Sequence, residues 1–363
     1  MAKSNRREFL QSQATKSLAI GGLLATTSTT ILADDARPKI RIGQIGTKHA
    51  HAAGKLASIR KFGDVYDLVG VVEPDEAQRK RLAASATYRD VKWLTEEQLL
   101  NTKGLQAVAV ETEVKQLVST AQRCLDAGMH IHLDKPAGES LAAVRKLHAT
   151  AAKKKLTIQM GYMLRYNPAF QLMFQAVREG WLGDVFEVHT VMSKKISAAA
   201  RQSLLQNPGG TMYELGCHII DSLVYILGKP DEVTAHIRKT MGDELQDNML
   251  AVFDYPKATA TVRSSVVEPV GFRRRQFVVV GTEGVIDIRP LEPPQMDLVL
   301  EQSHGSYKKG VQTPQLPRST GRYDGEFLDL AAVIRQEKEF AWSAEHDLAT
   351  HEAILKASGM PVD

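Results

Sequence analysis

The sequence predicts an α/β chain in which a doubly wound parallel sheet comes first and a second domain with an antiparallel sheet follows. Over about residues 37–160, apolar strand-like stretches alternate with helix-like stretches, which is the pattern of parallel βαβ units. From about residue 184, strand-like stretches follow one another across short turns, which is typical of antiparallel sheets. The length of 363 residues agrees with two or three domains of about 150 residues each.

The first domain, residues 37–160, is predicted from five strands and the helices between them. The strands are expected at 39–45, 67–72, 107–110, 130–133 and 157–160, and the helices at 50–59, 76–84, 114–127 and 141–154. Residues 93–100 are expected to carry a further short helix with its acidic start at Glu96 and Glu97. Right-handed crossovers bring the carboxyl ends of parallel strands to one edge of the sheet, where ligands bind. Residues at the ends of these strands are therefore the first candidates for a site.

The second domain, residues 161–363, is predicted to open with a helix and to continue as a sheet. A helix is expected at 168–180, a further helix from residue 211 to Gly228, and closing helices at 326–336 and 348–357. Strands are expected at 184–193, 232–239, 248–254, 259–267, 276–280 and 285–288, and residues 303–322 are expected to form a loop.

The composition excludes several classes of protein. With 43% hydrophobic and 24% charged residues, the chain is neither disordered nor fibrous, and it has no run of about 20 apolar residues that would mark a multi-span membrane protein. Most of the net charge of +4 lies within residues 1–33, which hold four basic residues and one acidic residue. The rest of the chain therefore gives no electrostatic reason to expect a nucleic-acid partner.

Residues 1–33 resemble a twin-arginine export signal. Arg6 and Arg7 are followed by Phe9-Leu10, a weakly apolar stretch covers residues 17–25, and Ala33 offers a small residue before a cut. The alternative is a basic leader that stays on a cytoplasmic protein. Because twin-arginine substrates cross the membrane already folded, the resemblance implies a periplasmic protein that acquires its cofactor first and holds it tightly, with no membrane span after the signal is removed.

A turn for a dinucleotide is predicted at Gly46, after the first strand, with Glu73 at the end of the second strand 27 residues later. In such a turn glycine lets the main chain approach the pyrophosphate, and Glu73 would accept hydrogen bonds from the ribose and favour NAD over NADP. Thr47 and Lys48 would complete the cofactor-binding turn. However, Lys48 and His51 stand where further glycines are usual. A merely structural strand–turn–helix therefore remains an alternative.

The helix after Gly209-Gly210 carries Glu214, His218 and Asp221 at i, i+4 and i+7, so that they share one face. A carboxylate beside an imidazole on an otherwise apolar helix suits acid–base chemistry, with the histidine accepting a proton from an alcohol. The alternative is a buried histidine whose hydrogen bonds are simply satisfied.

Three segments together carry a family resemblance. They are residues 127–136 with Asp134-Lys135-Pro136, residues 161–168 with Arg165-Tyr166 (and Gly180 and Gly183 downstream), and residues 209–221 with His218 and Asp221. On these motifs the chain resembles the Gfo/Idh/MocA family, named for glucose–fructose oxidoreductase and inositol dehydrogenase, over about residues 38–360.

The resemblance implies a Rossmann domain, an open-faced and mostly antiparallel second sheet, and a homo-oligomer, either a dimer or a tetramer. It also implies oxidation of a sugar or polyol hydroxyl with NAD, or with NADP. By position, Lys135 would lie near nicotinamide and substrate, His218 would be the general base, and Glu214 stands where the family commonly has Asp. The substrate pocket would be bordered by Arg165, Tyr166 and Asp221.

The chain departs from the family pattern at positions on the cofactor side. Asp134 replaces the commoner Glu before Lys-Pro, Glu111-Thr112-Glu113 replaces Thr-Pro-Asn, and Gln116 replaces His. These departures bear on the type and affinity of the cofactor more than on the fold.

Three other constellations are set aside. No metal is expected at His49, His51, His130 and His132, because no carboxylate or cysteine spacing completes a ligand set. Cys217 and His218 are neighbours on a helix and point about 100° apart, so they do not form a nucleophilic pair. Arg273–Arg275 is interpreted as a solvated or interfacial strand end.

The leading hypothesis is therefore an exported NAD(P)-dependent oxidoreductase that acts on a sugar or polyol. Two alternatives remain: a redox-neutral enzyme that cleaves glycosides with the help of bound NAD, and a non-catalytic sugar-binding protein on the same fold.

Overall fold

The computed structural model describes residues 37–363, so the predicted export signal at residues 1–33 lies outside the described residues. Within residues 37–363 no helix is both long and apolar enough to cross a membrane.

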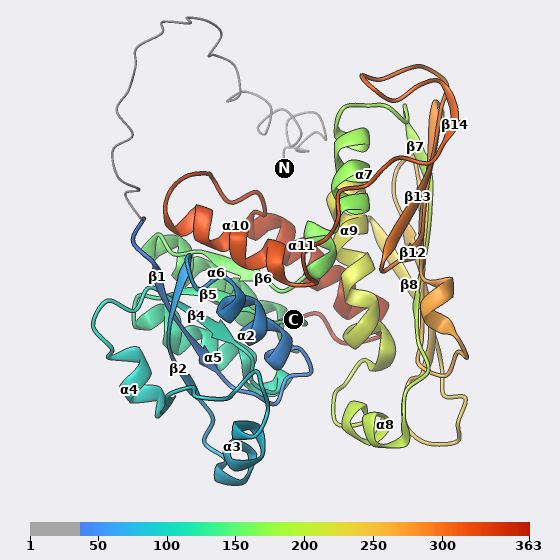
Figure 1. The fold of residues 1–363 in the computed structure, drawn as a ribbon. Coiled ribbons are helices and arrows are strands. Elements are labelled where there is room, and N and C mark those ends of the chain that lie inside the picture. Colours follow the sequence, from blue (N-terminus) through green and yellow to red (C-terminus); the bar gives the residue numbers. More distant parts are fainter. Residues whose placement is uncertain (1–36) are drawn as a thin grey trace, which may run out of the picture. The chain divides into compact units, whose positions relative to one another are not determined.

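The first sheet is six-stranded and entirely parallel, in the order β3-β2-β1-β4-β5-β6. Its strands are β1 (Ile40–Ile45), β2 (Tyr66–Val72), β3 (Trp93–Leu94), β4 (Ala107–Val110), β5 (His130–Leu133) and β6 (Ile158–Met160). The helices between them are α2 (Ala52–Lys61), α3 (Glu76–Ala83), α4 (Glu96–Leu100), α5 (Val114–Asp126) and α6 (Leu141–Lys154). The predicted doubly wound sheet is confirmed (Figure 1).

Burial explains why these segments form this sheet. All four residues of β4 are fully buried, as expected of a central strand covered by helices on both faces. The helix α5 turns one apolar stripe inward, including Leu117, Ala121, Cys124 and Leu125, at the spacing of a single helical face. The carboxyl edge of the sheet is formed by the residues that follow the strands: Gly46 after β1, Glu73 after β2, Glu111 after β4 and Asp134 after β5.

The second sheet has eight strands in the order β14-β13-β12-β11-β7-β10-β9-β8, and only the β7–β10 pair is parallel. The strands are β7 (Val185–Ser193), β8 (Glu232–Arg238), β9 (Asn248–Asp254), β10 (Thr259–Ser265), β11 (Gln276–Gly281), β12 (Gly284–Leu291), β13 (Pro294–Leu300) and β14 (Gly310–Gln312). Figure 1 shows α7 (Pro168–Arg178) and α9 (Cys217–Leu227) on one side of it. The predicted mostly antiparallel sheet is confirmed.

The structure adds elements that the sequence did not predict. The helix α8 (Ala198–Leu204), the short 3-10 helices η1 (Met163–Tyr166) and η3 (Gly271–Arg274), and the strands β3, β13 and β14 were not expected. The expected loop at 303–322 contains β14. The single helix expected from residue 211 to Gly228 is present, but Met212–Gly216 has π-helical geometry (η2) before α9 begins.

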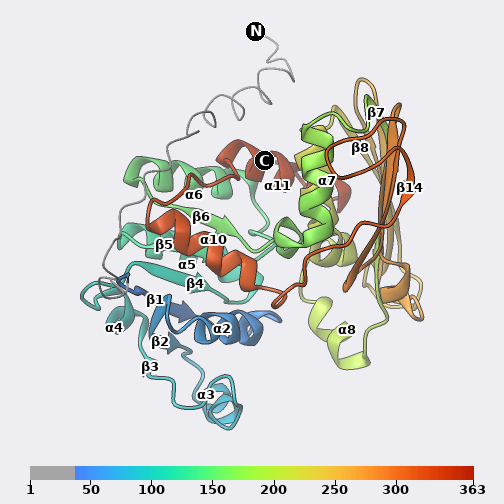
Figure 2. The ribbon, with the colours of Figure 1, turned by 45° about the horizontal axis from the view of Figure 1, so that its top comes forward.

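The end of the chain returns to the first sheet. The helix α10 (Asp324–Ile334) packs against α2 and η1, and α11 (Ala344–Ala357) packs against α6 and α9. Figure 1 and Figure 2 both place α10 beside the first sheet. The Tyr66 hydroxyl on β2 donates to the main-chain oxygen of Phe327 at 2.6 Å. Residues distant in sequence therefore complete the packing around the candidate site.

Candidate active site

The turn after β1 requires glycine at Gly46. Its φ is +92°, and a Cβ placed there would lie 2.6 Å from main-chain atoms of Glu111 and Thr112. The loop after β1 therefore lies directly against the loop after β4. This is the close approach expected of a Rossmann turn at the carboxyl edge of the sheet.

Glu73, at the end of β2, is held by the same turn. One carboxylate oxygen accepts a hydrogen bond from the Thr47 hydroxyl at 2.6 Å, and the other accepts one from the main-chain N–H of Asp75 at 3.0 Å. The Lys48 ammonium lies 3.7 Å from the Asp75 carboxylate. The glycine turn and the acid at the end of β2 fit the adenosine half of a dinucleotide.

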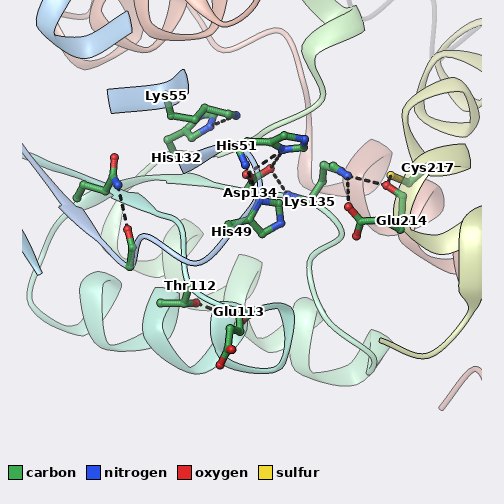
Figure 3. Close-up of polar contacts among 12 residues, drawn as sticks. His49, His51, Lys55, Thr112, Glu113, His132, Asp134, Lys135, Glu214 and Cys217 are labelled. Carbon is green, nitrogen blue, oxygen red and sulfur yellow. Dashed lines mark hydrogen bonds and ion pairs between the residues drawn. The ribbon is translucent and has the colours of Figure 1, made fainter. Parts of the chain in front are cut away.

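Lys135 and Glu214 form an ion pair across the two halves of the chain. The Lys135 ammonium, 1% exposed, donates to the main-chain oxygen of Glu214 at 2.6 Å and lies 3.3 Å from its carboxylate (Figure 3). Burial alone would lower the pKa of Lys135, but the charges of Glu214 and Asp134 and the hydrogen bond to Glu214 act together against it and raise this pKa. Burial would raise the pKa of Glu214, but Lys135 and the nearby imidazoles lower it. Both groups are therefore charged.

The π turn makes the main-chain part of this contact available. In a π-helical segment some main-chain carbonyls lack their usual hydrogen bond within the helix, and such segments are frequent at functional sites. Here the carbonyl of Glu214, within η2, accepts a hydrogen bond from the ammonium of Lys135. Glu214 and Lys135 are thus fixed relative to each other by main chain as well as side chain.

His218, in the first turn of α9, is a neutral imidazole beside this pair. It is 3% exposed, and its Nδ1 has no hydrogen-bond partner among the described residues. Burial holds its pKa well below the usual value, and the charge of Lys135 and the ring of His51 lower it further. The rings of Tyr162 and His51 each lie 6.2 Å away between centroids. His218 can therefore accept a proton.

Arg165 and Asp221 lie behind His218 as a fully buried pair. The guanidinium donates to both carboxylate oxygens of Asp221, at 3.0 and 2.7 Å, and to Asp347 at 2.6 Å. The ring of His346 lies 3.0 Å from the same Asp221 carboxylate. Neither side chain of the pair has exposed surface, so both are placed to fix α9 against η1 and α11. Their predicted contact with substrate stays a prediction.

Tyr166 lines a cavity away from Lys135, Glu214 and His218. Its hydroxyl donates to Asp329 at 2.8 Å and accepts from Gln159 at 3.0 Å. The cavity it lines, about 670 Å³, is walled by α7, residues 315–321 and the start of α10, and it contains none of the residues Lys135, Glu214 and His218. The structure thus brings together Lys135, Glu214 and His218 but not Tyr166.

Sequence reasoning missed a buried polar chain beneath the edge. Lys55, fully buried in α2, contacts Glu326 of α10 and His132 of β5, each at 2.6 Å. Burial, followed by the charge of Lys55, lowers the pKa of His132 to about 3. The sequence offered one indication of this buried chain, which was a lysine, Lys55, beside Leu56 and Ile59 on the apolar side of the predicted helix.

Both domains of the chain match models of known protein families. Residues 40–162 match an oxidoreductase family with an NAD-binding Rossmann fold, and residues 170–287 match the C-terminal domain of the GFO/IDH/MocA family. The chain belongs to the GFO/IDH/MocA family. It is therefore an oxidoreductase of the NAD-binding Rossmann class, and the resemblance seen in its motifs is confirmed.

Relatives with names are distant. The chain is 24% identical to scyllo-inositol 2-dehydrogenase (NADP(+)) IolW of Bacillus subtilis, over 76% of this chain and 84% of the relative. It is 28% identical to the uncharacterized oxidoreductase YhhX of Escherichia coli over 52% of this chain, and so spans about half of that relative, 54%.

A solved structure has the same fold. It is that of UDP-N-acetylglucosamine 3-dehydrogenase GnnA from Acidithiobacillus ferrooxidans, with a TM-score of 0.72 over 89% of this chain and 97% of that one. Its sequence identity is 16%, so the likeness concerns the fold alone.

Proposed function

We propose that this GFO/IDH/MocA protein oxidises a hydroxyl of a sugar or polyol with NAD or NADP. The observation that carries the proposal is the charged Lys135–Glu214 pair beside the neutral His218, at the ligand edge of a Rossmann sheet. The name of the relative IolW, an inositol dehydrogenase, supports a polyhydroxylated substrate.

The protein's own residues handle the proton. His218, neutral and with an unpartnered nitrogen, takes the proton of the reacting hydroxyl. The positive charge of Lys135 stabilises the oxygen as that proton leaves. Glu214 keeps Lys135 charged and in place, and the Arg165–Asp221 pair positions the helix that carries His218. A bound nicotinamide cofactor supplies the hydride acceptor.

The cofactor would be held by Gly46, Thr47, Lys48 and Glu73, with Lys135 at its reactive end. A carboxylate at Glu73 favours NAD, because it repels a 2′-phosphate. NADP remains an alternative, since the relative IolW is named for NADP(+).

We also propose that the protein is exported folded to the periplasm and works as a homo-oligomer. Support for export comes from the twin-arginine sequence at residues 5–11. An exported enzyme meets no free nicotinamide pool, so the same sequence favours a second candidate function: glycoside cleavage with a resident cofactor that is restored in each cycle. A non-catalytic sugar-binding protein would instead need neither the Lys135–Glu214 pair nor a neutral His218 beside it.

The deciding experiment is to purify the full chain after export, denature it, and identify the released nucleotide by absorbance and mass spectrometry. About one NAD or NADP per chain supports a resident cofactor. Turnover of sugars and polyols with added NAD then supports net oxidation, and glycoside cleavage without added NAD supports the second candidate. Failure to retain or bind either nucleotide contradicts both.

A further inference from the structure

Two imidazoles in the turn after β1 face one buried carboxylate at the end of β5. Nδ1 of His49 lies 2.7 Å from one oxygen of Asp134, and Nδ1 of His51 lies 3.2 Å from both oxygens (Figure 3). The side chains are 5%, 17% and 0% exposed. No metal is expected here from the sequence, because no carboxylate or cysteine spacing completes a ligand set, but the fold brings Asp134 to these two histidines.

The three side chains are close enough for one ion to contact all of them. One ligand atom from each of His49, His51 and Asp134 lies within 4.8 Å of the other two. At His49, the nitrogen that faces Asp134 at 2.7 Å would offer its lone pair to such an ion when unprotonated.

A second buried carboxyl group, that of Glu111, adjoins Asp134. Glu111, at the end of β4, is fully buried, and neither of its carboxylate oxygens has a hydrogen-bond partner among residues 37–363. Buried carboxylates are normally paired or bound to a cation. The buried ammonium of Lys55 lies 2.6 Å from the Glu326 carboxylate.

The site is braced by main chain. The N–H of Lys135 donates to one oxygen of Asp134 at 2.7 Å, and the N–H of His49 donates to the carbonyl of Glu111 at 3.2 Å. Outer contacts of this kind fix the orientation of metal ligands. Asp221, His346 and Asp347 form a second group whose possible ligand atoms lie within 4.8 Å of one another. However, the Arg165 guanidinium already binds both of its carboxylates.

We infer that His49, His51 and Asp134 bind one divalent transition-metal ion, with Glu111 as the adjoining carboxylate. Their nitrogen and oxygen donors favour Zn²⁺ as that ion. Two imidazoles and carboxylate oxygen are ligands that Zn²⁺ accepts in proteins. The ion would tie the turn after β1 to the residue that precedes Lys135. This site adjoins the proposed hydroxyl chemistry, since the His51 ring lies 6.2 Å from that of His218, but metal binding by these residues does not depend on that chemistry.

The test is metal binding by the full chain, purified without a histidine tag and stripped with a chelator. We expect about one Zn²⁺ per chain by elemental analysis after dialysis, and a thermal midpoint that rises as Zn²⁺ is added. His49→Gln and His51→Gln should each weaken binding at least about tenfold. His130→Gln is the matched control and should bind as the wild type does, since His130 lies on β5 outside the cluster and its Nδ1 accepts from Thr157.

Glu111→Gln gives a further variant that keeps the shape of the site. If a cation balances Glu111, this change weakens Zn²⁺ binding while the circular dichroism spectrum stays that of the wild type. The inference is overturned if stripped wild-type protein binds no stoichiometric Zn²⁺, or if binding survives unchanged in both His49→Gln and His51→Gln. Should those two variants fail to fold, an unchanged Zn²⁺ affinity in Glu111→Gln and an unchanged thermal midpoint of wild type in Zn²⁺ overturn it instead.

Discussion

Individual residues at the ligand edge owe their chemistry to burial and to their partners. Lys135 stays charged because Glu214 lies beside it, and His218 stays neutral because it is buried next to that positive charge. The sequence could predict these three residues because each stands in a short motif. It could not predict that Arg165 and Asp221 bond to each other, because they come from segments that only the fold brings together.

Replacing His218 with Asn should lower turnover by at least about 100-fold, because a positioned base contributes roughly that much. The dissociation constant for NAD should change little, since the side chain lies beside Lys135 rather than at the Gly46 turn. Turnover on a panel of polyols and sugars, together with NAD binding by calorimetry, checks both statements. His130→Asn serves as the control, and near-normal turnover of His218→Asn would remove the histidine from the chemistry.

Replacing Glu73 with Gln should shift the preference for NAD over NADP by about tenfold toward NADP, because the charge that repels a 2′-phosphate is removed. The ratio of the two dissociation constants measures this shift. Asp75→Asn neutralises the neighbouring carboxylate, which bonds the same turn through Lys48. If the two variants shift the ratio equally, the effect is one of overall charge and Glu73 has no special place in the site.

At the scale of elements, the alternation of strands and helices predicted five of the six strands of the first sheet, since each of the five is an apolar run closed by a polar residue or glycine. The two-residue strand β3 was missed. Irregular elements escaped prediction. The π segment Met212–Gly216 has the same apolar pattern as an α-helix, and β13 begins at Pro294 after another proline, which argues against a strand. The contact of Lys55 with Glu326 spans 271 residues, a distance over which one sequence carries no pairing signal.

Replacing Gly46 with Ala should lower the free energy of unfolding by about 3 kcal/mol, combining backbone strain with forced contact. The added Cβ meets the main chain of Glu111 and Thr112, which cannot move without shifting β4. Gly180→Ala is the matched control, because that glycine also has a positive φ, +75°, but open space around it, so only about 1 kcal/mol is expected. Urea unfolding of both variants compares the two values. Equal losses would mean that the approach of the two loops places no demand on residue 46.

At the scale of the whole molecule, the last two helices join the sheets. The helix α10 supplies Glu326 to Lys55 beneath the ligand edge, and α11 supplies Asp347 and His346 to the pair behind His218. The parts that hold the candidate site in shape therefore come from residues near the end of the chain. We therefore expect that a loss of packing at α11 lowers the free energy of unfolding of the whole molecule.

His351 on α11 should make the stability of the molecule sensitive to acid. It is 1% exposed, neither ring nitrogen has a hydrogen-bond partner within the described part of the chain, and burial lowers its pKa to about 4. Asp363 raises this pKa and His148 lowers it, each by less than burial does. The unfolded chain binds the proton near pH 6.5 and the folded chain only near pH 4. Stability is therefore fully present above pH 6.5 and falls as the pH drops through this window.

By this linkage, His351 should cost the folded state about 2 kcal/mol between pH 7 and pH 5. His351→Leu keeps a side chain of similar size and removes the titration, so its unfolding free energy should lose about 2 kcal/mol less than that of the wild type over the same range. Urea unfolding at pH 7, 6 and 5 measures both slopes, and His130→Leu controls for the loss of a histidine that is only partly buried. Parallel slopes for wild type and His351→Leu would show that this buried imidazole is not what makes the junction of α11 sensitive to acid.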